Sequence, residues 1–131
     1  MESIIKASFG LVGGLASYLL GGWDALLQTL VLFIALDYVF AVIVAGTHGK
    51  LSSKISFKGI AKKVGILVLV AVSHQIDVVM SSDHIVRDTV IFFYLANELL
   101  SLLETTSKTD LPIPDALKKT VDILKNKGDG N

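Results

Sequence analysis

The chain has 131 residues, of which 52% are hydrophobic and 18% are charged, and its mean hydropathy is +0.65. A soluble domain of this size needs a larger charged surface, so the composition indicates a membrane protein of one domain. The formal net charge is zero, and the absence of cysteine excludes disulfides, thiolate metal sites and thiol nucleophiles.

The first apolar segment, residues 4–22, is short for a membrane span and rich in glycine. We expect it to be retained as a membrane helix, because no clear signal-peptide cleavage site follows its apolar run. Small residues recur on one predicted helix face, which lets two helices approach closely within one chain or between chains. These residues are Ala7, Gly10, Gly14, Ser17 and Gly21.

The second apolar segment, residues 25–45, is the strongest membrane signal in the chain, and it follows a short turn at Trp23 and Asp24. Trp favours the membrane interface, and Asp24 is a suitable N-cap for the helix that follows. We therefore expect the first two spans to form a hairpin. The one ionisable side chain of the second span is Asp37.

A basic stretch without acidic residues, 46–63, separates the second span from the third. We expect it to be a cytoplasmic loop whose lysines meet anionic headgroups, either on a short surface helix or in a solvated loop. Because it lies between two spans, we assign it to topology and lipid contact and not to nucleic-acid binding. The lysines are Lys50, Lys54, Lys58, Lys62 and Lys63.

The third predicted span is residues 60–80 and the fourth is residues 89–104. The fourth is too short for a hydrocarbon core of about 30 Å unless it extends into its flanks or tilts. The tail, residues 105–131, is polar, and residues 115–127 have the spacing of a short amphipathic helix.

Five lysines lie in the basic stretch and five in the tail, whereas the connection of residues 81–88 holds only Arg87, which predicts that the stretch and the tail are cytoplasmic. We therefore expect an all-α membrane protein with four transmembrane helices in two hairpins, N-in and C-in. If the first segment lies in the interface, three spans remain and the N-terminus is outside. With four spans, the transmembrane domain is residues 1–104, and residues 105–131 form the cytoplasmic tail.

Polar side chains within the predicted spans are candidates for the functional site, because their burial in lipid is costly. They either satisfy one another inside one bundle or line water once several copies assemble. We favour the water-lining role for the stripe on the fourth span, since Tyr94, Glu98 and Ser101 share one helix face. The candidates are Asp37, His74, Asp77, Tyr94, Asn97, Glu98, Ser101 and Glu104.

The chain has no phosphate loop, no G-x-S-x-G motif and no H-E-x-x-H motif, and its three histidines fall on different segments. We therefore predict that the protein is not an enzyme and that it holds neither a metal ion nor a cofactor.

Several motifs together resemble those of small phage holins of the toxin-secretion and phage-lysis type. They are Lys50-Leu51-Ser52-Ser53-Lys54 with Gly59 and Lys62-Lys63, Phe93-Tyr94-Leu95-Ala96-Asn97-Glu98-Leu99-Leu100-Ser101 with Glu104, Leu36-Asp37-Tyr38, and residues 111–114 before Leu117-Lys118-Lys119. The resemblance covers nearly the whole chain. It departs from the family pattern at Thr105 and at residues 108–110, which affects only the expected geometry of the tail.

The resemblance implies a holin, which forms a homo-oligomer in the cytoplasmic membrane of the host cell. Its lesions let an endolysin or a toxin escape, and the cell lyses. Two other classes stay open. One is a small ion- or proton-conducting oligomer that uses Asp37, His74 and Glu98 as a relay, and the other is an antiholin-type regulator of such a pore.

Overall fold

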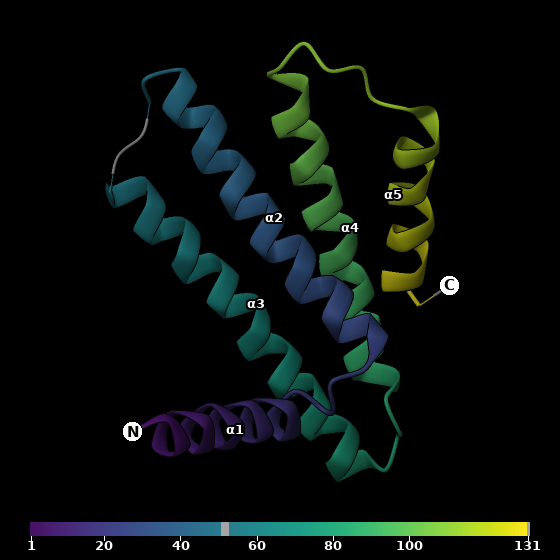
Figure 1. The fold of residues 1–131 in the computed structure, drawn as a ribbon. Coiled ribbons are helices and arrows are strands. Elements are labelled where there is room, and N and C mark those ends of the chain that lie inside the picture. The colour runs from purple at the N-terminus through teal and green to yellow at the C-terminus, as the bar shows by residue number, and fades with distance from the viewer. Residues whose placement is uncertain (51–52, 131) are drawn as a thin grey trace.

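The computed structural model describes residues 1–50 and 53–130, except for the side chains of residues 53–56. The described residues form helices and no strand, as expected for an all-α protein (Figure 1). The helices are α1 (Glu2–Leu19), α2 (Ala25–Thr47), α3 (Ser53–Met80), α4 (Ile85–Ser107) and α5 (Asp115–Gly128). By length and composition, α2 and the Phe57–Met80 part of α3 qualify as membrane spans. The arrangement with four spans stays a prediction.

One helix boundary follows directly from the sequence, and another differs from expectation. Asp24 caps α2 as predicted, because its carboxylate accepts a hydrogen bond from the Leu27 N–H at 2.9 Å. However, α3 begins at Ser53, so most of the predicted loop of residues 46–63 is helical. Lysine is a good helix former, and extending an existing helix is easier than nucleating a new one. The third helix therefore continues into the basic stretch.

The centre of the bundle is α4. It packs against α2 on one side and α3 on another, whereas α2 and α3 touch each other little (Figure 1). The most polar of these three helices therefore lies between the two most apolar ones. The shared core consists of Leu27, Leu30, Ile66, Val70, Ile91 and Leu95.

The outward faces of α2 and α3 remain apolar. Their exposed side chains include Leu32, Leu36, Val39, Ile43, Val64, Val68, Val72 and Val79. An apolar surface of this extent is unusual on a soluble monomer and is typical of a surface that lipid or another protein covers. The two apolar helices thus indicate a membrane protein.

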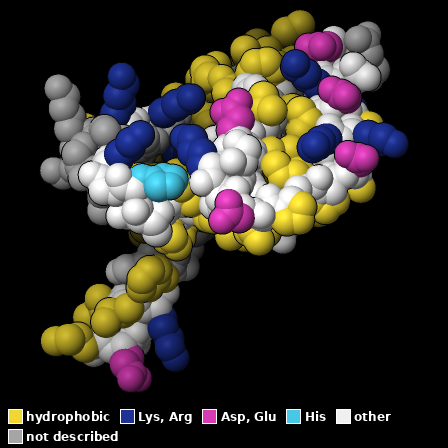
Figure 2. Space-filling model, turned by 90° about the horizontal axis from the view of Figure 1, so that it is seen from above, with side chains coloured by type: hydrophobic (Ala, Val, Ile, Leu, Met, Phe, Trp, Pro, Cys, Tyr) yellow, Lys and Arg dark blue, Asp and Glu magenta, His cyan; other side chains and the backbone are white. Residues whose placement is uncertain are grey.

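The connections fall at two ends of the bundle. The links from α2 to α3 and from α4 to α5 share one end, and the turns from α1 to α2 and from α3 to α4 share the other (Figure 1). Viewed from the first end, lysine side chains surround a region that also holds acidic groups (Figure 2). The lysines of the basic stretch and the start of the tail therefore share one end.

The first helix, α1, lies across the opposite end of the bundle (Figure 1). All of α1 is described, and none of its residues is buried. It contacts α3 and does not pack along α2, so the described structure lacks the expected hairpin of the first two segments. The cause is the turn, where Gly21 (φ +86°) and Gly22 (φ +107°) redirect the chain through a conformation that glycine allows. This placement matches the alternative in which the first segment lies in the interface.

The last helix, α5, confirms the amphipathic helix expected in the tail and runs back along α4 (Figure 1). Val121 is buried at this contact, and Leu124 packs against the bundle core. The charged side chains of α5 stay exposed.

Candidate functional site

Three charged side chains meet between α2, α3 and α4. Lys63 of α3 pairs with the Asp37 carboxylate of α2. Its Nζ also donates to Oε1 and Oε2 of Glu98 on α4, at 3.0 and 2.7 Å. The Ser101 hydroxyl donates to Oδ1 of Asp37 at 2.9 Å. We call these four side chains the charge network, because each of the three helices is linked through it to the other two.

The charge network is largely hidden. Asp37 and Glu98 are each 3% exposed, and the Lys63 side chain is 16% exposed. One ammonium faces two carboxylates, so an excess negative charge remains when both acids are ionised. Buried carboxylates without a cation are strongly unfavourable. The close packing of α2 and α4 at this level therefore depends on Lys63.

A polar groove connects the charge network to the surface. It has a volume of about 360 Å³ and lies between α3 and α4. Its polar lining consists of Lys62, Lys63, Tyr94, Asn97, Glu98, Ser101 and Glu104. The predicted polar stripe of α4 therefore lines one groove. Asp37 contacts this stripe through the hydrogen bond that it accepts from the Ser101 hydroxyl.

Asp77 and His74 lie elsewhere, at the end of the bundle that α1 crosses. Asp77 is buried and accepts hydrogen bonds from the N–H groups of Val86 and Arg87 at 2.9 and 2.8 Å, and from the Ser82 hydroxyl. In this structure it therefore caps the start of α4. The His74 ring stacks on the His84 ring with 6.2 Å between their centroids.

Arg87 organises this end of the bundle. It is fully buried and donates to the carbonyl oxygens of Leu20 and Gly22 at 2.6 and 3.0 Å. It also binds both carboxylate oxygens of Asp24, at 2.9 and 3.1 Å. The hydrogen bond from Arg87 lowers the pKa of Asp24 below its usual value. Arg87 thereby ties the turn between α1 and α2 to α4.

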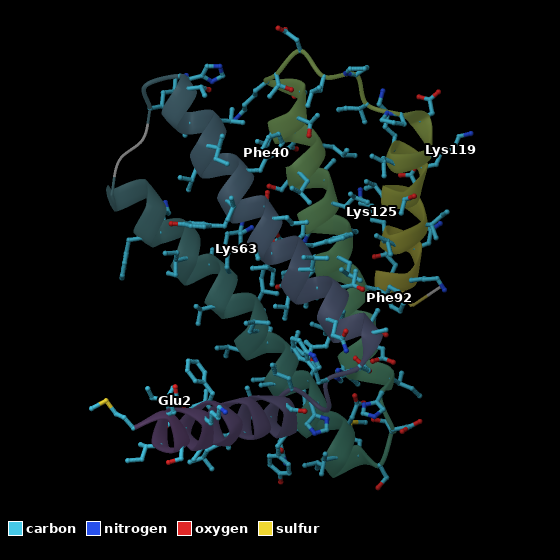
Figure 3. The ribbon with its side chains drawn as sticks, viewed as in Figure 1. Glu2, Phe40, Lys63, Phe92, Lys119 and Lys125 are labelled. Carbon is cyan, nitrogen blue, oxygen red and sulfur yellow. The ribbon has the colours of Figure 1, made fainter. Side chains whose placement is uncertain are left out.

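Two of these residues were not recognised from sequence. Lys63 was grouped with the headgroup lysines, but the structure pairs it inside the bundle (Figure 3). The signal was its register, since Lys63 shares a helix face with the core residues Ile66 and Val70. Arg87 was counted only for topology, although it is the single arginine of the chain and its partner Asp24 follows the first turn.

The other lysines of the basic stretch behave as expected of surface groups. Lys50, Lys58 and Lys62 are exposed. The side chain of Lys54 lies outside the described residues, as do Leu51 and Ser52 of the first holin-like motif. Of the predicted packing face, Gly10 and Gly14 have open space around them. Contact of the lysines with lipid and of the glycines with another helix stays a prediction.

A bundle of apolar helices closed around a charge network defines a small helical membrane protein. The chain matches the model of the bacteriophage holin family over residues 14–126, and it therefore belongs to that family. This confirms the resemblance found in the sequence. The family is one of non-enzymatic membrane proteins, in agreement with the lack of enzyme motifs in the chain.

Relatives cover most of the chain. An uncharacterized protein of Listeria monocytogenes is 46% identical over 129 residues, which are 97% of this chain and 91% of that protein. An uncharacterized 14.9 kDa protein of Clostridium perfringens is 37% identical over 131 residues, 97% of this chain and 99% of that protein. A probable holin of Bacillus phage phi105 is 28% identical over 113 residues, 86% of this chain and 83% of that protein. No solved structure matches the chain.

Proposed function

We propose that the protein is a holin that assembles in the cytoplasmic membrane of a host cell and opens lesions there. An endolysin or a toxin then passes through the lesions. Family membership and the probable holin of phage phi105 support this function. The structural observation that best supports this function is the charge network. It buries three ionisable groups between helices whose outer faces are apolar.

The described bundle of α2, α3 and α4 corresponds to the closed state of this proposal. Its charged groups satisfy one another, while α2 and α3 present apolar side chains to lipid. In the open state, the polar groove between α3 and α4 faces water shared by several copies. Opening therefore requires an environment that hydrates Asp37 and Glu98, because ionised side chains are costly to place in lipid. Crowded copies that turn their grooves toward each other provide that environment.

In this proposal α2, α3 and α4 span the membrane and α1 lies in the outer interface. The position of α1 across one end of the bundle supports this arrangement over four spans (Figure 1). An N-terminal protease-cleavable tag distinguishes the two. Cleavage from outside intact spheroplasts is expected for three spans, whereas protection until the membrane is broken supports four.

The glycine face of α1 is proposed to join copies of the chain. Gly10 and Gly14 are exposed and have no neighbouring atoms at the position of an added Cβ. Replacing both by Leu is expected to delay or abolish lesions, because bulky side chains prevent close helix approach. Normal cross-linked oligomers in the G10L/G14L variant would show that this face does not join copies.

Expression of the protein without an endolysin tests the function. A holin depolarises and kills the host and releases a cytoplasmic reporter protein. The second candidate is an ion- or proton-conducting oligomer, which the groove beside the charge network favours. That oligomer depolarises the cell and passes small ions but retains the reporter protein. A regulator of the antiholin type leaves the host polarised and alive.

A further inference from the structure

The close contacts between α5 and α4 lie in the second half of α5. Lys127 Nζ lies 5.4 Å from the centre of the Phe92 ring, near the C-terminal end of α5 (Figure 3). Gly128 sits against the backbone of Phe93, so closely that an added Cβ would lie 2.7 Å from its Cα. Val121 is buried midway along α5. The tail helix is therefore docked on α4 and is not a free appendage.

This docking places α5 deep beside α4. The linker joins the two helices at the Ser107 end of α4, and Gly128 reaches Phe93, which lies nearer the start of α4 than its end. At 1.5 Å per residue, α4 is about 35 Å long and α5 about 21 Å. A hydrocarbon core is about 30 Å thick. If α4 spans the membrane, docked α5 passes beyond the middle of the core.

The exposed face of α5 does not suit that depth. Its charged residues are Asp115, Lys118, Lys119, Asp122, Lys125 and Lys127, and all of them are exposed. Charged side chains in the middle of a bilayer are strongly disfavoured. The same helix does suit a membrane surface, because its apolar side holds Val121 and Leu124 and its lysines can meet anionic phosphates.

We propose that α5 is a clasp that binds α4 while α4 lies outside the bilayer core, and that it leaves α4 for an anionic lipid surface when α4 spans the membrane. This inference rests on the proposed lesion-forming function. While docked, α5 covers the side of α4 around Phe92 and Phe93, which then cannot contact lipid or a second copy. Release removes the charges of α5 from the level of the bilayer core and frees that side of α4.

A reversible cross-link tests the clasp in the full-length protein. The chain has no cysteine, so F93C and G128C introduce one pair. A Cβ on Gly128 would lie 3.0 Å from the Phe93 Cβ and 2.7 Å from the Phe93 Cα, so the end of α5 must move outward by roughly one ångström in this pair, which brings the two Cβ atoms into the range of a disulfide. The oxidised pair is reconstituted in phosphatidylglycerol–phosphatidylethanolamine vesicles that hold a dye. We expect at least a tenfold lower release than after reduction, with F93C alone unaffected by oxidation.

Release at equal rates before and after reduction would overturn the clasp, since α5 would then remain on α4 in the open state. A second readout does not require lesions. The yield of the F93C–G128C cross-link is compared in detergent, in phosphatidylcholine vesicles and in phosphatidylglycerol vesicles. At least a fivefold drop in the anionic vesicles is expected, and an unchanged yield contradicts the inference. If the wild type releases no dye but this yield drops, the proposed function fails and the movement of α5 stands.

A single substitution gives an independent test. G128A adds a Cβ that collides with the Phe93 backbone, yet alanine favours the helical state of α5. The matched control is G46A, since Gly46 is also helical and has open space around it. We expect G128A to start lysis at least twofold earlier than G46A. Equal onset times, together with an unchanged protease sensitivity of α5, would contradict the clasp.

Discussion

Lys63 offers the sharpest test of how the bundle is held closed. The K63M substitution keeps a long, flexible side chain and removes the ammonium group that faces Asp37 and Glu98. Both carboxylates are 3% exposed, so water cannot replace the lost cation without opening the bundle. Removing one partner of a buried ion pair costs about 3–5 kcal/mol. That loss corresponds to roughly two to four orders of magnitude in the folded-to-unfolded ratio.

The assay is equilibrium unfolding of the full-length protein in detergent micelles, followed by helical circular dichroism. The control is K62M, because Lys62 is the neighbouring lysine and is exposed. The triple variant K63M/D37N/E98Q removes every charge of the network and should recover most of the loss, since neutral amides can still exchange hydrogen bonds. A K63M protein within about 1 kcal/mol of K62M, or a triple variant as unstable as K63M, would show that the buried charges of the network do not hold the bundle closed.

Three further outcomes are expected. E98Q should shift the onset of lysis, because Lys63 then balances Asp37 alone, and unchanged timing would remove Glu98 from the mechanism. G21A should destabilise the fold by about 1–3 kcal/mol more than G22A, since both glycines have positive φ but only at Gly21 would a Cβ meet Arg87, at 2.7 Å. D24N should cost about 1 kcal/mol at pH 7, as Asp24 is half exposed and Asn still caps α2. The lowered pKa of Asp24 adds stability above about pH 4 that is lost in more acidic solution. The free energy of unfolding of D24N should therefore fall less than that of the wild type as the pH decreases below about 4.

The helices themselves were predictable because their signals are local. Long apolar runs gave α2 and the core of α3, the spacing of apolar residues gave α5, and Asp24 marked the start of α2. The extent of α3 was only partly predictable, because the basic stretch suits either a solvated loop or a short surface helix, and the structure joins such a helix to the third span. Local patterns could not reveal that α1 turns away across the bundle, since two glycines allow many chain directions.

The site was only partly predictable because its partners are distant in sequence. Asp37, Glu98 and Ser101 stood out as polar groups in apolar segments. Their cation, however, lies 26 residues from Asp37 and 35 from Glu98, and only the packing of three helices brings them together. Asp77 was predicted for its polarity alone, and the structure gives it a backbone-capping role that no periodic pattern encodes.

The central position of α4 affects how the whole bundle responds to a disturbance. Since α2 and α3 touch each other little apart from the Lys63–Asp37 pair, the distance between them depends mainly on α4. A shift of α4 along its axis therefore disturbs its contacts with α2 and with α3 at the same time. The few contacts between α2 and α3 do not compensate for that loss. We expect such an assembly to have few half-opened arrangements and to change state abruptly. Abrupt opening of this kind suits the lesion-forming function proposed above.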